Sequence, residues 1–531
     1  MTSNPNTAYE NLQKLINIGR SLSTEKNISI LLEKILIEAR KLSFSDGGTL
    51  YLMTEDKRLN FEILHNESKN IFLGGSHDPV PETFYPVKLY VDGVPNTHSV
   101  SAVCALEGKT IHIEDAYTDK NYDFSGPKGF DKKHDYRSKS FLNVPLTNHK
   151  DDIIGVLQLL NSTVDGEIIP YSDEVINLVE ALASQASIAL TNKLLIDEQK
   201  QLFKSFIQLV SEALEHKDEV TGGHCTRVPV LTMMLADAIN NDNTGAYKKF
   251  SFNEDEMEEL YVAGWLHDFG KVATPEHIMN KSTKLECLFD KIDLLILKFE
   301  ILKRDKKVDF YKKSLDENSN IKDLKLQLKS DLDKIDKDKK FLKDCNVGGE
   351  FMSDGMKIRI DEISNQMICV EDKEINVISD DEKKNLKISR GTLSDSDFDI
   401  MKEHVSLSYE LLSKLPYPKH LKNVPFYAGC HHEKINGTGY PNGYSGNRLP
   451  LQARIIAIAD VFEGLTAPDR PYKKGYKLSK AMSILKSMVK DNEIDKDLFD
   501  LFIDKEIYLD YAKDNVASTQ IDNINKDDLL A

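Results

Sequence analysis

Histidine and aspartate side chains recur in five short segments between His224 and Asp460, and they limit how this 531-residue chain can fold. Two of the segments place such residues side by side, as His267-Asp268 and His431-His432. Imidazole and carboxylate groups are ligands of divalent metals, and one ion takes about four to six of them. If the segments act together, the C-terminal half must bring all of them to one point. The seven candidate ligands are His224, His267, Asp268, His404, His431, His432 and Asp460.

A set of this size predicts two ions that share a bridging carboxylate, for which Asp268 is the candidate. The apolar segment Leu260 to Leu266 predicts a helix that also carries His267 and Asp268. Histidine-rich sites suit iron or manganese, and also nickel or zinc, better than magnesium or calcium. Two such ions activate water for attack on phosphorus, and Lys271, one turn further on, could hold a phosphate oxygen. We therefore expect a metal-dependent phosphoester hydrolase.

Charge and composition exclude several other classes. Lysine and arginine number 69 against 86 acidic residues, and the formal net charge of −17 disfavours bulk nucleic acid and anionic membranes as partners. The sequence contains no apolar run of membrane-spanning length and no secretory leader, so we expect a cytoplasmic protein. The six cysteines show no CxxC spacing, which argues against a zinc ribbon or a disulfide framework.

The N-terminal region has the pattern of an α+β domain over residues 1–190. Apolar residues alternate at Leu50 and Leu52 and again from Leu59 to Ile63, and Ile153 to Leu160 forms a nearly continuous apolar strand. Helical patterns flank these strands from about residue 9 to 42 and from Ser172 onward.

A long helix is predicted over residues 172–216, where it would connect the two halves of the chain and offer a surface for dimerisation. Ser172 is a candidate N-cap, and no glycine or proline interrupts the chain before Gly222. One helix of about 45 residues would be about 65 Å long. Two helices with a bend near Asn192 are the alternative. The apolar residues at spacings of three and four are Val175, Val179, Leu182, Ala186 and Ala189.

Residues 282–390 differ in composition and are interpreted as an insertion. Apolar residues at helical spacing run from Leu285 to Leu302 and, after a polar break, from Ile321 to Leu342, which predicts a helical hairpin resembling a coiled coil. The alternating stretch Met356 to Ile360 is expected to be a loop or a small β-hairpin. The insertion could bind a partner, although a solvated charged face is the more common meaning of such a pattern.

Several motifs together resemble one known family. HDFGK (267–271), MKEH (401–404), HHEKINGTGYP (431–441) and IADVFEGLTAPDRPYK (458–473) stand in the order found in HD-GYP phosphodiesterases, a branch of the HD metal-dependent phosphohydrolases that cleave cyclic di-GMP. The resemblance covers about residues 203–280 and 391–511 and implies an all-α HD-type domain over residues 203–531, with the insertion inside it.

The resemblance also assigns roles by position. One ion would be held by His224, His267, Asp268 and Asp460, and the second by Asp268, His404, His431 and His432. The remaining roles concern substrate: Lys271 would contact the scissile phosphate, Tyr440 in the Gly-Tyr-Pro loop would shape the pocket, and Arg470 and Lys473 would hold phosphates.

Two positions depart from the family pattern. Val220 stands where some members have a glutamate that binds a third ion, so two ions are expected. Asn436 replaces the usual aspartate before the Gly-Tyr-Pro loop and keeps an acceptor for the turn while losing its charge. Asp218 precedes the Gly222-Gly223 turn and is expected to cap it, with orientation of His224 as the alternative. Glu433 is a candidate to orient a ligand histidine, and a surface acid is an equal alternative.

The N-terminal region resembles a GAF sensory domain in the order of TLYLMTEDKRLNFEIL, IHIEDAY, SFLNVPL and IIGVLQLLN. The two resemblances together imply a homodimeric enzyme that hydrolyses cyclic di-GMP to pGpG, with GMP as a further product, under control of an unknown small molecule bound by the GAF domain. One alternative substrate is mixed cyclic GMP-AMP. A further alternative, from another class of protein, is a non-catalytic nucleotide-binding scaffold.

Overall fold

The computed structural model describes residues 5–215, 217, 223–316, 320–349, 351–371, 373–468 and 475–530. The chain divides into two compact units, Met1–Leu202 and Phe203–Ala531, and each has its own hydrophobic core. Among the described residues, no helix combines the length and the apolar character needed to cross a bilayer.

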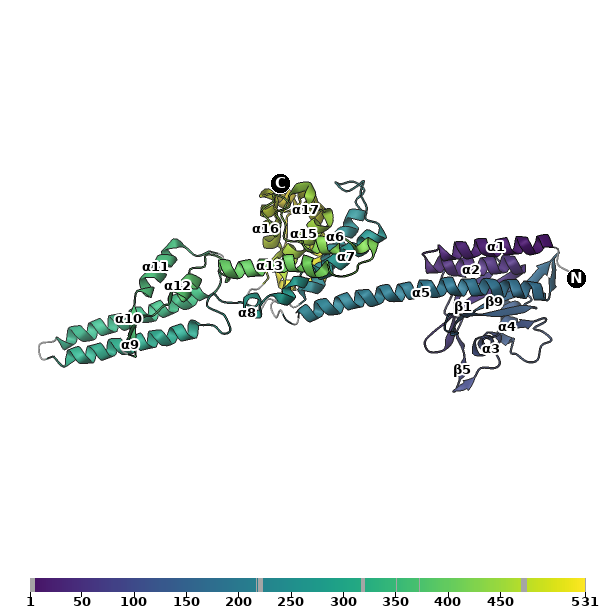
Figure 1. The fold of residues 1–531 in the computed structure, drawn as a ribbon, viewed down its shortest axis with the longest axis horizontal. Helices are drawn as coiled ribbons and strands as arrows, with labels where there is room; N and C mark the ends of the chain where they lie inside the picture. The colour runs from purple at the N-terminus through teal and green to yellow at the C-terminus, as the bar shows by residue number, and fades with distance from the viewer. Residues whose placement is uncertain are drawn as a thin grey trace. The chain divides into compact units, whose positions relative to one another are not determined.

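The N-terminal unit is built around one antiparallel sheet (Figure 1), whose main strand order is β3-β2-β1-β9-β8-β7, with β10 beside β9 and β4 beside β2. Its elements are α1 (Pro5–Ser23), α2 (Ile28–Ser43), β1 (Ser45–Met53), β2 (Arg58–Asn66), β3 (Ile71–Gly74), β4 (Val87–Lys88), β5 (Tyr90–Val91), β6 (Val94–Pro95), α3 (Val100–Glu107), β7 (Ile111–Ile113), α4 (Ser125–His134), β8 (Phe141–Thr147), β9 (Ile153–Val164), β10 (Glu167–Ile169) and α5 (Asp173–Glu215).

The alternating residues form the strands predicted from the sequence. Leu50 of β1 pairs with Ile63 of β2 on one side and with Leu157 of β9 on the other, and all three side chains are buried. They pack with residues of α1, α2 and the first part of α5. The predicted α+β fold of this region is confirmed.

Helix α5 runs without a break from Asp173 to Glu215, so the prediction of one long helix is confirmed and the bend near Asn192 is absent. The Ser172 hydroxyl accepts from the backbone N–H of Val175 at 3.4 Å, as expected of an N-cap. Val179, Leu182 and Ala186 are buried in the core of the N-terminal unit. Their spacing of three and four therefore reflects packing within the unit, and they are not available as a dimer surface.

The C-terminal unit is almost entirely helical, which confirms the predicted all-α region with a helical hairpin. Its elements are α6 (His224–Asn240), α7 (Glu254–Leu266), η1 (Phe269–Ala273), α8 (Glu276–Met279), α9 (Ile292–Ser314), α10 (Ile321–Asn346), α11 (Asp354–Ser364), β11 (Met367–Val370), β12 (Lys373–Asn376), α12 (Asp380–Leu386), α13 (Asp395–Leu412), η2 (Lys419–Leu421), α14 (Val424–Ala428), η3 (Gly446–Arg448), α15 (Leu451–Thr466), α16 (Leu478–Lys490), α17 (Lys496–Asp504), α18 (Ile507–Asn515), η4 (Ser518–Gln520) and α19 (Lys526–Leu530).

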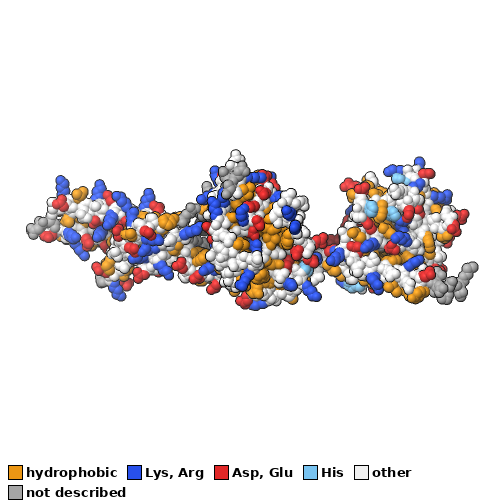
Figure 2. Space-filling model, turned by 90° about the horizontal axis from the view of Figure 1, so that it is seen from above, with side chains coloured by type: hydrophobic (Ala, Val, Ile, Leu, Met, Phe, Trp, Pro, Cys, Tyr) orange, Lys and Arg blue, Asp and Glu red, His pale blue; other side chains and the backbone are white. Residues whose placement is uncertain are grey.

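Residues 282–390 contain the antiparallel pair α9 and α10 (Figure 1) and have a buried cluster of their own. Figure 2 shows basic and acidic side chains mixed over the surface of the hairpin. The stretch Met356 to Ile360, expected to be a loop or β-hairpin, lies instead in α11, where Ile360 and Ile363 are buried. Its alternation covers too few residues to distinguish a strand from one face of a helix. The small hairpin follows it as β11 and β12.

Candidate metal centre

His267 and Asp268 lie immediately after α7, so the helix ends at Leu266, two residues earlier than predicted. Helix α7 begins with a capping box between Asn253 and Glu256 and ends at Leu266. His267 is its C-cap, and Asp268 precedes the short helix η1. The change of direction brings His267 Nε2 within 3.3 Å of Asp268 Oδ2. The side chains of His267 and Asp268 therefore point to one place. On a continuous helix two neighbouring side chains would diverge, and both could reach the same site only across a wide cavity.

Gly270 allows α13 to pass directly over this turn. A Cβ atom at Gly270 would lie 1.9 Å from the carbonyl oxygen of His404, so only glycine fits. The Ser408 hydroxyl accepts from Gly270 N at 2.8 Å and donates to the carbonyl of His267 at 2.9 Å. The close approach places His404 Nε2 3.3 Å from Asp268 Oδ1.

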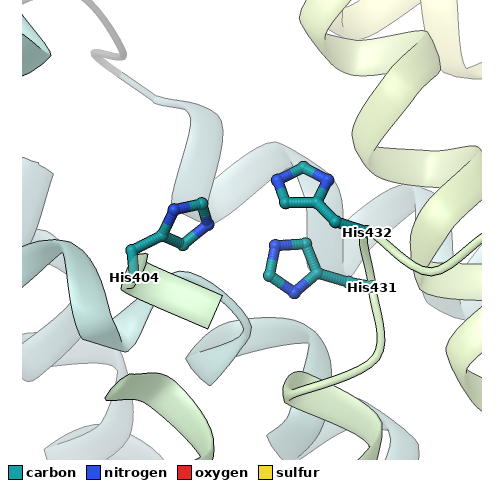
Figure 3. Close-up of side chains that lie close together, drawn as sticks. All are labelled: His404, His431 and His432. Carbon is teal, nitrogen blue, oxygen red and sulfur yellow. The ribbon is translucent and has the colours of Figure 1, made fainter. Parts of the chain in front are cut away.

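His431 and His432 follow α14, and their rings lie close to that of His404 (Figure 3). His431 Nε2 lies 3.7 Å from Asp268 Oδ1, and His432 Nδ1 lies 3.7 Å from Asp460 Oδ2. Ligand atoms of His404, His431 and His432 all lie within 4.8 Å of one another, as do those of His224, His267 and Asp268. Two groups of candidate ligands therefore lie side by side.

Asp268 stands between the two groups. Its Oδ2 faces His267 and also lies 3.4 Å from His224 Nε2, while its Oδ1 faces His404 and His431. Asp460 of α15 lies on the His224 side, with Oδ1 3.2 Å from His224 Nε2. Each oxygen of Asp268 thus faces a different set of imidazoles, which is the arrangement expected of a bridging carboxylate.

Three of the imidazoles have a buried nitrogen without a hydrogen-bond partner. His267, His404 and His431 direct Nδ1 to the backbone carbonyls of Gly264, Met401 and Ala428 at 2.8, 2.6 and 2.6 Å. A carbonyl only accepts, so Nδ1 carries a proton, and in the neutral ring Nε2 has the free lone pair. These three Nε2 atoms are buried and unpartnered. A cation among them would satisfy all three, so the residues fit a metal centre.

Glu463, which sequence analysis did not single out, orients the fourth imidazole. It is fully buried on α15, and its carboxylate accepts hydrogen bonds from His224 Nδ1 and, at 2.7 Å, from Arg227 Nε. Asp218, expected to cap the Gly222-Gly223 turn or alternatively to orient His224, lies outside the described residues. A signal was present in the sequence, because Glu463 follows Asp460 by three residues on a mostly apolar helix and must share its face.

The protonation states agree with a cation-binding centre. Burial alone would raise the pKa of Asp268, but Lys271 and His267 lower it well below its usual range. Burial, together with the neighbouring imidazoles of His432 and His267, lowers the pKa of His431, and burial lowers that of His432 to about 4. Although burial opposes it, the surrounding carboxylates raise the pKa of His224, so a metal there would displace a proton.

The Gly-Tyr-Pro loop packs against the backbone that follows the paired histidines. A Cβ atom at Gly439 would lie 2.4 Å from Lys434 N and 2.6 Å from the carbonyl of His432. The Tyr440 ring centroid is 5.0 Å from that of His432. Both carboxylate oxygens of Glu433 accept backbone N–H groups of this loop, at 2.7 and 3.0 Å. Glu433 therefore orients the loop and not an imidazole, and it is buried, so neither interpretation from the sequence was right.

Asn436 supplies the expected acceptor to the turn, since its Oδ1 accepts from Thr438 N at 2.9 Å. Lys271 Nζ lies 2.8 Å from Asp268 Oδ2, at the edge of the ligand set. Arg470 and Lys473, predicted to hold phosphates, lie outside the described residues, as does Val220.

Comparison with known proteins places these features in families. The GAF domain family matches residues 27–190, and two HD domain families match residues 221–344 and 381–498. The chain is 39% identical over 95 residues to the cyclic di-GMP phosphodiesterase response regulator RpfG of Xanthomonas campestris, covering 18% of this chain and 25% of that protein.

Two further relatives show comparable similarity. The 3'3'-cGAMP-specific phosphodiesterase 3 of Vibrio cholerae is 38% identical over 95 residues, covering 18% of this chain and 20% of that protein. A cyclic di-GMP phosphodiesterase of Thermotoga maritima is 34% identical over 98 residues, covering 18% and 26%. The matching stretches thus span about a quarter or less of these relatives. Residues 27–190 of this chain are thus recognised as a GAF domain, and residues 221–344 and 381–498 match HD domains.

Proposed function

We propose that this chain is a metal-dependent phosphodiesterase that hydrolyses cyclic di-GMP to pGpG, with GMP as a further product. The observation that carries the proposal is the convergence of three unpartnered Nε2 atoms and three further ligand residues around Asp268. A buried group of this kind is costly unless a cation completes it. The similarity to phosphodiesterases of cyclic dinucleotides supports the choice of substrate.

Two transition-metal ions, iron or manganese by preference and nickel or zinc as alternatives, would be held by the seven residues. One site would use His224, His267, Asp268 and Asp460, and the other Asp268, His404, His431 and His432. When bound, the ions would supply an activated water and neutralise charge on the phosphoryl group. Asp268 remains an anion at neutral pH because its pKa is lowered. The pKa values of His431 and His432 are also lowered, so both imidazoles remain neutral and can bind a metal ion.

The other residues of the centre would position substrate. Lys271 contributes a positive charge beside Asp268 that could turn to a phosphate oxygen. Tyr440, against His432, would form a wall of the pocket. Arg470 and Lys473 remain candidates for the outer phosphates.

Mixed cyclic GMP-AMP is a second candidate substrate, because one of the relatives is named as specific for 3'3'-cGAMP. The full-length chain, supplied with manganese or with iron under anaerobic conditions, would be incubated with each dinucleotide and the products identified by mass spectrometry. A faster release of pGpG than of the mixed linear product supports the first substrate, and the opposite ratio supports the second.

The variants His267→Ala and Asp268→Ala test whether the chain is an enzyme or a scaffold. Both should lose bound metal and hydrolysis, whereas His277→Ala, which changes an exposed histidine outside the motifs, should keep both. Hydrolysis that persists in Asp268→Ala would overturn the proposed centre. Metal content is measured in the same samples, so a failure to bind metal and a failure to turn over substrate can be told apart.

We propose, further, that the GAF domain binds a small molecule that sets the activity, and that the active species is a homodimer. The N-terminal unit contains a cavity of about 470 Å³ whose lining includes Tyr51, Phe61, Phe124, Phe141 and Gln158. Its mixture of aromatic rings with an amide suits a planar molecule that has hydrogen-bonding groups. Native mass spectrometry of the full chain would detect such a ligand.

A further inference from the structure

The last turns of α5 belong to the C-terminal unit and lie against the backbone that carries candidate ligands. Ile207 and Leu214 are buried there, and Ile207 joins the C-terminal core. Two polar side chains of the same turns, Ser211 and Glu215, bond to the backbone of two other helices. Each of the backbone groups that they bond lies within two residues of a candidate metal ligand.

Glu215 caps the helix that begins with His224. Helix α6 starts directly after Gly223, which has no side chain, so the first backbone N–H groups of the helix lack the usual partner. Glu215 supplies one, because its Oε1 accepts from Cys225 N at 2.5 Å. Cys225 is buried, so its N–H depends on this acceptor. A carboxylate at this end of α6 also interacts favourably with the helix dipole.

Ser211 bonds to the helix that ends just before His267. The carbonyl of Trp265 belongs to the last turn of α7, where carbonyl groups lack a partner within the helix. The buried hydroxyl of Ser211 donates to this carbonyl at 2.8 Å. A serine inside a helix often bonds to a carbonyl of its own helix, whereas Ser211 joins α5 to α7. The bond therefore fixes the backbone two residues before His267.

We propose that Glu215 and Ser211 are positioning residues of the metal centre. Through the backbone that each one bonds, Glu215 sets the place of the His224 imidazole, and Ser211 sets the place of the His267 imidazole. Neither side chain touches a ligand atom, so both act through the helix ends that carry the ligands. The inference rests on the metal centre proposed above.

The two proposed ion sites should respond differently to a change at the end of α5. His224 and His267 both belong to the site that Asp460 completes. The imidazoles of the other site come from α13 and from the segment after α14, and they are those of His404, His431 and His432. Loss of Glu215 or Ser211 is therefore expected to weaken one ion and to spare the other. General destabilisation of the unit would weaken both.

A cobalt(II) titration of the metal-free full chain tests this assignment, because the visible absorption of bound cobalt depends on the geometry of its ligands. The wild type should bind two equivalents. Glu215→Ala should weaken one equivalent about 10-fold, the lower end of the range for residues that orient a ligand, and should change its absorption spectrum. Glu215→Gln, whose amide oxygen still accepts from Cys225 N, should recover most of the affinity. Glu212→Ala, which changes an exposed acid on the preceding turn, should match the wild type.

Ser211→Ala is a second variant, which removes only a hydroxyl and should weaken the same equivalent. It decides the question if Glu215→Ala does not fold. The inference is overturned if both variants bind two ions as the wild type does, or if both ions are weakened equally. Equal losses in Glu215→Gln and Glu215→Ala also overturn it, because the cap on Cys225 would not be the cause. A wild type that binds no cobalt refutes the metal centre itself, so the two failures can be told apart.

Discussion

Glu463 distinguishes His224 from the other imidazoles of the centre. Three histidines are oriented by backbone carbonyls, which no substitution of a side chain can remove, but His224 depends on a carboxylate. That carboxylate accepts from two donors, His224 and Arg227, while it is fully buried. A change confined to Glu463 therefore acts on one ligand and leaves the remaining ligands in place.

We expect Glu463→Gln to weaken metal binding by about 10- to 100-fold, the range found when a residue that orients a ligand is lost. The amide has only one acceptor oxygen, so either His224 or Arg227 loses its partner. The measurement is metal content per chain after dialysis at graded metal concentrations, with kcat recorded in parallel. Glu463→Asp, which keeps the charge, should recover part of the affinity.

Glu259→Gln is the matched control, because Glu259 is also a buried glutamate of this unit, yet it accepts from the backbone and side chain of Asn423 away from the ligand set. It should keep its metal. Equal losses of metal in Glu259→Gln and Glu463→Gln would show that the effect is general destabilisation and would contradict a role in orienting His224.

Gly439→Ala should lower kcat/KM about 10- to 100-fold while metal content stays close to that of the wild type. The added Cβ would lie 2.4 Å from Lys434 N, and the loop must shift by enough to displace Tyr440 from His432. A misplacement of about 1 Å is sufficient for a loss of this size. Steady-state kinetics on the full chain provide the measurement.

Gly349→Ala serves as the control for this change, since a Cβ at Gly349 has no neighbour within 4 Å. It should leave both kcat/KM and metal content unchanged. Wild-type kinetics in Gly439→Ala would mean that the loop does not position substrate.

At the scale of elements, the centre depends on the contact between η1 and α13. Ser408 joins them, since its buried hydroxyl bonds to the backbone of both Gly270 and His267. Ser408→Ala should reduce the free energy of unfolding of the C-terminal unit by about 1–3 kcal/mol, because two buried backbone groups lose their partner. Urea unfolding monitored by Trp265 fluorescence measures it.

Ser413, the first residue after α13, provides the control. It is exposed, and its hydroxyl donates a hydrogen bond to the carbonyl of Tyr409. Ser413→Ala should change the free energy of unfolding by less than about 0.5 kcal/mol. Should the two variants unfold at the same urea concentration, the contact between η1 and α13 would not depend on Ser408.

The elements themselves were largely predictable, because periodicity of apolar residues is a local property. The strands around Leu50 and Leu157, the long helix α5 and the hairpin of α9 and α10 were all expected. The end of α7 was not, because no glycine or proline marks it, and the turn after Leu266 is held instead by contacts with α13. Met356 to Ile360 was misassigned since five residues cannot separate the two periods.

At the scale of the whole molecule, the sequence indicated which residues belong to the centre but not how they meet. The motif order and the paired residues identify the types of ligand. Which imidazoles each oxygen of Asp268 faces depends on how α6, α13 and α15 are placed in the fold. Likewise, Val179 and Ile188 have similar local patterns, and only the tertiary structure buries one and exposes the other. Long-range packing decides both cases.

The two separate cores lead to a prediction about the whole chain. A ligand that binds one folded unit stabilises that unit by mass action, by about 2.7 kcal/mol at a free concentration of 100 times Kd. Manganese or iron should therefore raise the melting temperature of the C-terminal unit by about 5 °C and leave that of the N-terminal unit unchanged. The chain has 1 tryptophan, Trp265, in the C-terminal core. Its fluorescence reports that transition selectively, while calorimetry records both.

Two variants test whether the rise in melting temperature comes from metal bound at the proposed centre. His431→Ala removes a fully buried ligand and should abolish the metal-dependent shift of the Trp265 transition, whereas His277→Ala should retain it. A chelator should return the wild type to the melting temperature of the metal-free protein. If the melting temperature of His431→Ala rises by as much as that of the wild type, the bound ions lie elsewhere on the chain. If metal raises the melting temperature of the N-terminal unit, the cation acts on the surface and not on the residues around Asp268.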